Sequence, residues 1–312
     1  MANITAAMVK ELRELTGAGM MDCKKALGAT DGNMDEAVEW LRKNGMAKAE
    51  KKASRIAAEG VVACNLSADE KKGSIVEVNS ETDFVAKNEK FQTYVAAVAA
   101  QATNTTAADI DAFLAETWSL DSSKTVKEEL SSQIAVIGEN MNIRRFEQVC
   151  APDGFVQSYI HGGGRIGILL QVQSDVINDA IKEATKNVAM QVAAMNPKYV
   201  TKEEIPGDFV EHEKAILREQ INNDPKESAK PDKVKEGMIA GRISKELKEI
   251  CLVDQVYVKA EDGKQTVGQY LAQVAKENSA NLCIKKFVRY ECGEGLEKKN
   301  EDFAAEVAAQ MK

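Results

Sequence analysis

The chain is poor in the side chains that catalytic sites use most. Its 312 residues include two histidines, His161 and His212, and five prolines. It contains no H-E-x-x-H, no G-x-x-x-x-G-K-S/T, and no Ser-His-Asp or Cys-His constellation. Because general acid–base and nucleophilic catalysis depend on such groups, the sequence argues against an enzyme.

The six cysteines are widely scattered. They form no C-x-x-C pair, and no nearby pair of histidines could complete a zinc site with them. We therefore expect reduced thiols that act as small apolar residues, with no metal and no cofactor. The six are Cys23, Cys64, Cys150, Cys251, Cys283 and Cys292.

Long hydrophobic runs are missing as well. No apolar stretch approaches the roughly 20 residues that a membrane-spanning helix needs. The first residues show neither the pattern of a secretory signal nor that of a transit peptide. We therefore predict a cytoplasmic protein that makes no membrane contact.

Basic residues are outnumbered over the chain as a whole. Lys and Arg total 41 against 49 Asp and Glu, for a net charge of −8. A groove that follows nucleic-acid phosphates needs a basic surplus, so DNA or RNA is not expected as a direct ligand. The first 55 residues are the exception, because basic side chains exceed acidic ones there.

The length and a hydrophobic share of 44% suggest two or three domains. The first, residues 1–55, begins with three short helices. Met8, Leu12 and Leu15 recur with helical spacing and predict one buried face. The basic stretch 41–55 that closes the domain fits either a solvated linker or an extension of the third helix.

Two segments, 56–140 and 141–200, repeat one plan of antiparallel strands followed by helix. This repetition predicts two related α+β subdomains. The predicted strands span 61–66, 74–79, 143–150, 155–160 and 166–172, and the predicted helices span 91–102, 124–137 and 177–192.

The last third of the chain continues this core around an insertion. Residues 201–250 carry two amphipathic segments and predict a helical hairpin. The second subdomain is expected to resume over 251–292, and 293–312 to form a C-terminal helical module with Phe303 on its apolar stripe. Between them we predict strands at 253–259 and 282–290 and a helix at 267–277.

The segment Glu81–Asn88, ETDFVAKN, lies between a predicted strand and a predicted helix. In one interpretation Asp83 caps the helix while Phe84 packs on the core. In the other, Phe84 protrudes as a wedge into a partner's pocket and Asp83 accepts hydrogen bonds at the rim. The residues alone leave both open.

The run His161–Arg165, HGGGR, has a similar ambiguity. Successive glycines can direct backbone N–H groups at a phosphate, with Arg165 pairing to it. Because the run joins two predicted strands, a tight hairpin turn is the favoured interpretation. His161 is then either a hydrogen-bonded strand-end residue or a partner contact.

Met20 and Met21 follow a glycine turn in the first domain. They belong either to the core or to an adaptable binding surface, with Lys10 and Arg13 nearby. His212 lies on a charged helix and is expected to be solvated.

Two other function classes remain open at this level. An enzyme could use Asp83 or His161 as general base, but this requires a second titratable group within reach. An adaptor that binds nucleic acid or acts like a ubiquitin-associated domain could use the three N-terminal helices and the basic stretch 41–55. Such a function would leave most of the chain unexplained.

Five blocks together identify a family. They are Thr5–Leu27, Glu77–Asn88, Ile137–Arg145, His161–Gly167 and Gly293–Ala308. The five blocks span the whole chain. Together, and in this order, they resemble bacterial translation elongation factor Ts. The resemblance implies a guanine-nucleotide exchange factor for elongation factor Tu, without covalent chemistry of its own. It also implies an N-terminal domain similar to ubiquitin-associated domains, a two-part α+β core, a helical-hairpin dimerisation module at 201–250 and a C-terminal helix.

The resemblance also assigns roles to residues at matching positions. It implies a wedge that enters the G domain of Tu beside its magnesium and phosphate site, and three further regions of contact. The wedge comprises Thr82, Asp83, Phe84 and Val85; the N-terminal contacts are Lys10, Arg13, Met20 and Met21; the contacts of the second subdomain are His161, Gly162 and Arg165; and the C-terminal contact is Phe303.

Overall fold

Three helices at the N-terminal end pack around a small core of their own. A computed structural model describes residues 4–297. Its first helices are α1 (Ala6–Thr16), α2 (Met20–Ala29) and α3 (Met34–Lys52). The Thr5 hydroxyl caps α1, and Gly17 ends it with φ at +68°. Val9 and Leu12 form the buried stripe of α1. Leu15 lies outside that stripe and is 67% exposed, so the prediction that it is buried is wrong.

The basic stretch after residue 41 is helical as far as Lys52 and not a linker. Helix α3 runs through Gly45 and packs against α7 (Val126–Ile137). A Cβ at Gly45 would lie 3.5 Å from that of Ala135, so small residues allow the two helices to approach closely. Arg42 forms an ion pair with Glu128 across the same contact. The N-terminal helices are thereby joined to the rest of the molecule.

Two three-stranded antiparallel sheets form the centre of the molecule. The first has the order β1-β2-β3 and the second the order β4-β5-β6. Their strands are β1 (Glu59–Leu66), β2 (Lys72–Ser80), β3 (Met141–Cys150), β4 (Gly154–His161), β5 (Ile166–Ser174) and β6 (Leu282–Glu291). The return of the chain to the second sheet after the insertion, through β6, agrees with the prediction from sequence.

Strand β3 differs from its predicted place. Its residues were expected to open the second subdomain at 141, but β3 pairs with β2, with Ile75 opposite Glu147. Alternation of apolar residues predicts a strand but does not predict which other strand it pairs with. The chain passes from one sheet to the other only at Ala151–Gly154, where a turn carries it from β3 to β4.

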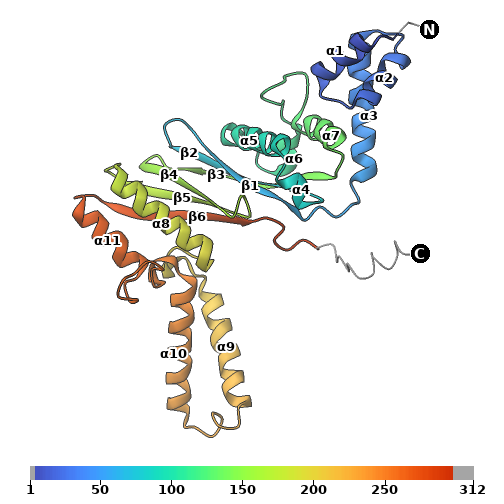
Figure 1. Cartoon of the computed structure of the whole chain (residues 1–312). Coiled ribbons are helices and arrows are strands. Elements are labelled where there is room, and N and C mark those ends of the chain that lie inside the picture. Colours follow the sequence, from blue (N-terminus) through green and yellow to red (C-terminus); the bar gives the residue numbers. More distant parts are fainter. Residues whose placement is uncertain (1–3, 298–312) are drawn as a thin grey trace.

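The sheets pack face to face, and helices cover their outer faces (Figure 1). Gly167 marks the closeness of this contact, because a Cβ there would lie 2.4 Å from a methyl of Val62 on the other sheet. Helices α5 (Glu89–Asn104), α6 (Ile110–Ala115) and α7 cover the first sheet, while α8 (Asp179–Met195) and α11 (Val267–Glu277) cover the second.

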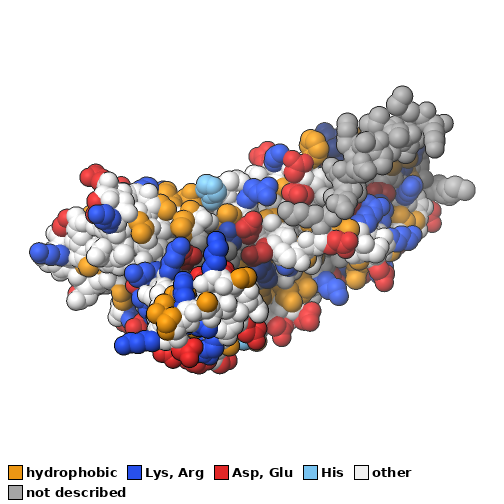
Figure 2. All heavy atoms as spheres, turned by 90° about the horizontal axis from the view of Figure 1, so that it is seen from below, with side chains coloured by type: hydrophobic (Ala, Val, Ile, Leu, Met, Phe, Trp, Pro, Cys, Tyr) orange, Lys and Arg blue, Asp and Glu red, His pale blue; other side chains and the backbone are white. Residues whose placement is uncertain are grey.

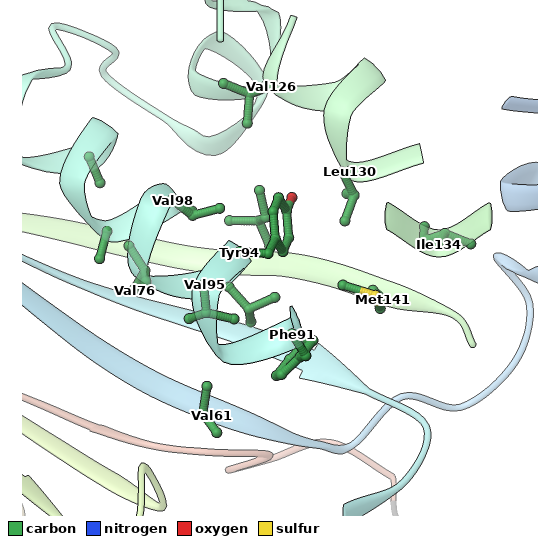
Figure 3. Close-up of a cluster of buried hydrophobic side chains, with 14 of the residues drawn as sticks. Val61, Val76, Phe91, Tyr94, Val95, Val98, Val126, Leu130, Ile134 and Met141 are labelled. Atoms are coloured by element: carbon green, nitrogen blue, oxygen red, sulfur yellow. The ribbon is translucent and has the colours of Figure 1, made fainter. Parts of the chain in front are cut away.

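Helix α5 supplies most of the core on the outer face of the first sheet (Figure 3). Phe91, Val95 and Val98 of α5 share one buried cluster with Val61 and Val76 of the strands. Each such side chain contributes about 1.5–3 kcal/mol by leaving water. This cluster anchors the segment that follows β2.

The insertion forms two packed helices that extend away from the sheets (Figure 1). They are α9 (Gly207–Asn223) and α10 (Asp232–Ile250), and short 3₁₀ turns flank them at Lys202–Glu204 and Leu252–Asp254. Ile221, Ile239 and Ile243 form the small core between the helices. Among residues 4–297 no helix has the length and apolar character to cross a membrane.

The strand predicted at 253–259 is wrong. Leu252 and Val253 donate their amides to the carbonyls of Tyr199 and Val200, and Leu252 is buried in the second core. Val253 and Tyr257 pack in the same core, whereas Val256 and Val258 are about half exposed. A short apolar run in the sequence does not distinguish this arrangement from a strand.

Candidate partner-binding site

A single helical turn, α4 (Asp83–Ala86), follows the end of β2 and carries the Asp-Phe pair. Val85 and Ala86 pack on the first core, whereas the Phe84 side chain is 81% exposed. The capping residue is Thr82, whose hydroxyl accepts a hydrogen bond from the amide of Val85 at 3.3 Å. The interpretation in which Asp83 caps and Phe84 packs inside is therefore wrong.

Asp83 presents a negative charge beside the ring. Its carboxylate accepts a hydrogen bond from Lys87 over 2.6 Å on the same turn. This bond lowers the pKa of Asp83 below its usual value. A carboxylate with a lowered pKa is a weak base, so Asp83 is a poor candidate for a catalytic base.

The base of α4 is held from the turn between α7 and β3. The Thr82 amide donates a hydrogen bond to Oε2 of Glu139 at 3.0 Å, and the Thr82 hydroxyl donates one to Oε1 at 2.7 Å. Next to it, the Asn140 amide donates to Oε1 of Glu81 at 2.6 Å. Sequence reasoning missed Glu139 as a functional candidate, although it lies in the block Ile137–Arg145 that carried the family resemblance.

The glycine run forms the turn of the β4–β5 hairpin, as favoured from sequence. His161 pairs with Ile166 in the ladder, and Gly162, Gly163 and Gly164 all have positive φ values. Such φ values favour glycine. The turn therefore needs glycines for its own geometry, without a phosphate to explain them.

His161 and Arg165 are exposed on this turn. The Tyr159 hydroxyl lies 2.9 Å from Nδ1 of His161 and hydrogen-bonds to it, which orients the ring on the surface. His161 is thus both hydrogen-bonded at a strand end and accessible to a partner.

Strand β1 brings the two segments into one region. Helix α4 packs against β1, and the Gly164 carbonyl accepts the Val62 amide of the same strand at 2.7 Å. A Cβ on Gly164 would lie 2.8 Å from that of Val61. The Asp-Phe turn and the glycine turn therefore both border β1, although they are far apart in the sequence.

The methionine pair lies on the surface of the N-terminal helices. Met20 and Met21 are 57% and 65% exposed, so the interpretation that places them in the core is wrong. Lys10 and Arg13 are exposed on α1, and Lys10 pairs with Glu14 at 3.7 Å. Met20, Met21 and the exposed Leu15 together give this domain an apolar surface at the α1–α2 turn.

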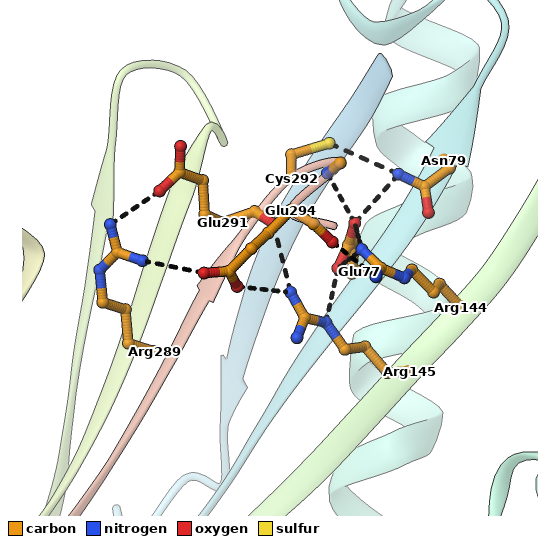
Figure 4. Close-up of polar contacts among 9 residues, drawn as sticks. Glu77, Asn79, Arg144, Arg145, Arg289, Glu291, Cys292 and Glu294 are labelled. Atoms are coloured by element: carbon orange, nitrogen blue, oxygen red, sulfur yellow. Dashed lines mark hydrogen bonds and ion pairs between the residues drawn. The ribbon is translucent and has the colours of Figure 1, made fainter. Parts of the chain in front are cut away.

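Buried Glu77 on β2 connects three sequence blocks (Figure 4). Its carboxylate accepts bonds from Nη1 of Arg144 at 3.0 Å, Nε of Arg145 at 2.6 Å, the side chain of Asn79 and the backbone amide of Gly293. Burial raises the pKa of Glu77, but these hydrogen bonds outweigh it and leave the pKa lowered. The network attaches the segment after β6 to the first sheet.

A cavity of about 600 Å³ lies between the N-terminal helices and α7. Its lining mixes acidic and basic side chains, including Asp22, Lys48 and Lys124, and contains no histidine or cysteine within the described part of the chain. Over the face in Figure 2, basic and acidic side chains are likewise interspersed. Neither feature resembles a catalytic cleft or a phosphate-tracking groove.

All six cysteines lie within residues 4–297, and none of them is paired. Burial raises the pKa of Cys64 and of Cys292 to about 12, which keeps both thiols protonated at neutral pH. Phe303, the predicted C-terminal contact, lies outside the described residues.

The geometry defines an α+β sandwich in which separated sequence blocks form exposed turns around β1. The sequence model for elongation factor TS matches residues 81–294. The chain is 49% identical to elongation factor Ts of Clostridium botulinum over 99% of both proteins, and 49% identical to that of Clostridioides difficile over the whole of both. It is 50% identical to that of Clostridium perfringens over 98% of each.

The chain therefore belongs to the elongation factor Ts family. Membership supports a general role in translation elongation as a nucleotide exchange factor for elongation factor Tu.

Proposed function

We propose that the chain releases GDP from elongation factor Tu by inserting the Asp-Phe turn into the G domain near its magnesium and phosphate site. The observation that carries this proposal is the position of Phe84, a large apolar ring left 81% exposed on a turn whose Val85 and Ala86 pack on the first core. An exposed aromatic on a rigid support is typical of an interface anchor.

Asp83 and its neighbours complete the wedge. Thr82 begins the turn, Val85 packs against the core, and Asp83 offers its carboxylate to hydrogen-bond donors at the rim of the pocket. Phe84 enters the pocket itself. Binding needs little reorganisation, because the turn is already formed in the free chain.

The exchange follows from linkage and needs no covalent step. If this chain weakens the affinity of Tu for GDP, GDP weakens the affinity of Tu for the chain by the same factor. Moving Tu from about 1% to about 99% of a releasing conformation requires roughly 5.5 kcal/mol of differential binding. One buried Phe supplies about 1.5–3 kcal/mol, so other contacts must contribute.

Three further regions supply these contacts in our proposal. The N-terminal helices dock through Lys10, Arg13, Met20 and Met21 on a second part of the G domain. The glycine turn docks through His161, Gly162 and Arg165, and the C-terminal segment through Phe303. The exposure of the residues in the first two regions supports this proposal.

The decisive experiment measures stimulated release of a fluorescent GDP analogue from Tu by stopped flow. Phe84→Ala should keep the fold and reduce the maximal release rate by about tenfold or more, since the lost burial is worth about 1.5–3 kcal/mol. Leu120→Ala is the matched control, because Leu120 is also an exposed apolar side chain, at 74%. An unchanged rate with Phe84→Ala would refute the wedge.

We also propose that the chain acts in the cytoplasm and, from the family resemblance, that the helical hairpin of α9 and α10 allows a homodimer. Within these two helices Val234, at 46%, is the exposed large apolar side chain. Sedimentation equilibrium of the wild type and of Val234→Glu tests the dimer. A monomer for both at every concentration would contradict it.

A further inference from the structure

The direction in which Phe84 projects cannot come from packing of its own ring, which is 81% exposed. It must come from the backbone of α4, a helix of four residues. A helix this short is not stable by itself in water, because the free-energy cost of nucleating it exceeds what the hydrogen bonds of a single turn contribute. Contacts from outside α4 must therefore hold it.

Two kinds of contact do so: Val85 and Ala86 pack on the first core, and Thr82 supplies polar contacts, with both of its donors going to one carboxylate. Its amide donates to Oε2 of Glu139 at 3.0 Å and its hydroxyl to Oε1 at 2.7 Å. The same hydroxyl oxygen accepts the Val85 amide at 3.3 Å. Hydrogen bonds to an ionised carboxylate are stronger than neutral ones. Glu139 thus fixes both the entry of the chain into α4 and the orientation of the cap.

Glu139 is itself held from both sides. Before it, the Gly138 carbonyl accepts a hydrogen bond from Lys52 at the end of α3. After it, buried Asn140 donates its amide to Glu81 at 2.6 Å and its side-chain NH₂ to the Arg55 carbonyl at 2.8 Å. The turn at 138–140 is therefore fixed against the N-terminal helices and against the end of β2.

We propose that Glu139 is a positioning residue for nucleotide exchange. Its two carboxylate oxygens set the orientation of α4 through Thr82, and α4 in turn aims the Phe84 ring at the partner. Glu139 acts without touching the nucleotide or the magnesium ion. This inference rests on the proposed wedge function.

The test is a double-mutant cycle between Glu139 and Phe84, read by stopped-flow GDP release from Tu. Glu139→Ala should lower the maximal stimulated rate by about fivefold, which is less than the loss expected for Phe84→Ala because the ring itself remains. The half-saturating concentration of the chain should change by less than about twofold, since the remaining docking surfaces are intact. In the Phe84→Ala background, Glu139→Ala should cause no further loss.

Two variants control for structure. Glu139→Gln retains one acceptor oxygen for the Thr82 amide and should fall between wild type and Glu139→Ala. If Glu139→Ala does not fold, Glu139→Gln by itself tests whether Glu139 positions α4. Glu147→Ala removes a partly exposed, ion-paired carboxylate from strand β3 and should leave the rate unchanged.

The outcomes separate this inference from the function on which it rests. If Phe84→Ala leaves release unchanged, the wedge itself fails. If Phe84→Ala slows release but both Glu139 variants match wild type, positioning by Glu139 is overturned and the wedge stands. Equal further losses in the wild-type and Phe84→Ala backgrounds also overturn positioning, because Glu139 would then act independently of the ring.

Discussion

The backbone amide of Gly293 donates to Oε1 of Glu77 over 2.8 Å, although the two residues are 216 positions apart. The contact joins the chain after the last strand to the middle of β2. It requires glycine, because Gly293 has φ at +73° and a Cβ would lie 2.2 Å from the carbonyl oxygen of Ala58. The C-terminal segment is thus attached to the sheet that also carries the Asp-Phe turn.

Gly293→Ala should destabilise the protein through both the backbone conformation and the clash. We expect a loss of about 2–4 kcal/mol in the free energy of unfolding, measured with urea. Gly263→Ala is the matched control, because Gly263 also has a positive φ, +62°, but no neighbour within 4 Å. If the two variants lose equal stability, the close approach to Ala58 contributes nothing.

The buried carboxylate of Glu77 should make stability depend on acid pH. Its folded-state pKa is lowered by its hydrogen bonds, whereas the unfolded value is about 4.3. The stability that ionised Glu77 contributes is therefore present above that unfolded value and is lost as the pH falls through the folded-state pKa.

Glu77→Gln tests this by urea unfolding at a series of pH values from 7 down to the acid limit of folding. The variant should lose about 2 kcal/mol at neutral pH, because Arg144 and Arg145 lose an ionic acceptor. It should also show a shallower decline in acid. Glu277→Gln, on the exposed end of α11, is the control. Parallel pH curves for wild type and Glu77→Gln would contradict the assignment.

Phe84 and Phe91 lie seven positions apart and should respond oppositely to truncation. Phe91 is fully buried in the first core and Phe84 is 81% exposed. Phe91→Ala should cost about 3–5 kcal/mol of stability, whereas Phe84→Ala should change it by about 0.5 kcal/mol or less. Thermal unfolding monitored by circular dichroism measures both. A large loss for Phe84→Ala would mean that the ring has a structural role.

The exposed methionines of α2 should affect binding of Tu more than the rate within the complex. Replacing both Met20 and Met21 with Ala should raise the half-saturating concentration of the chain about five- to tenfold. The maximal release rate should remain within about twofold, because the Asp-Phe turn is intact. Met195→Ala, which removes another exposed methionine at the end of α8, should change neither value. An unaltered half-saturating concentration for the double variant would remove α2 from the interface.

Local patterns predicted most elements but not their partners. The helical spacing of Phe91, Val95 and Val98 predicted α5, and the glycine run predicted the β4–β5 turn. The same kind of pattern misplaced β3 and produced a strand at 253–259 that does not exist. Periodicity reports which face of a segment is apolar, whereas pairing depends on long-range contacts that the local sequence does not encode.

The candidate site shows the same division. The family resemblance pointed to Asp83 and Phe84 in ETDFVAKN, yet local chemistry left both a buried ring and a protruding ring open and leaned toward the buried one. Exposure of the ring followed only from the fold, because Val85 and Ala86 occupy the core side of α4.

By itself the sequence determined the family, the acidic character, the shortage of catalytic groups and the residues of the proposed wedge. The tertiary structure decided that Glu139 supports Thr82, that Glu77 receives Gly293, and that the glycine turn borders the same strand as α4. These contacts join residues from 57 to 216 positions apart. They exist because two sheets and their covering helices pack at close range, and packing depends on the whole chain at once.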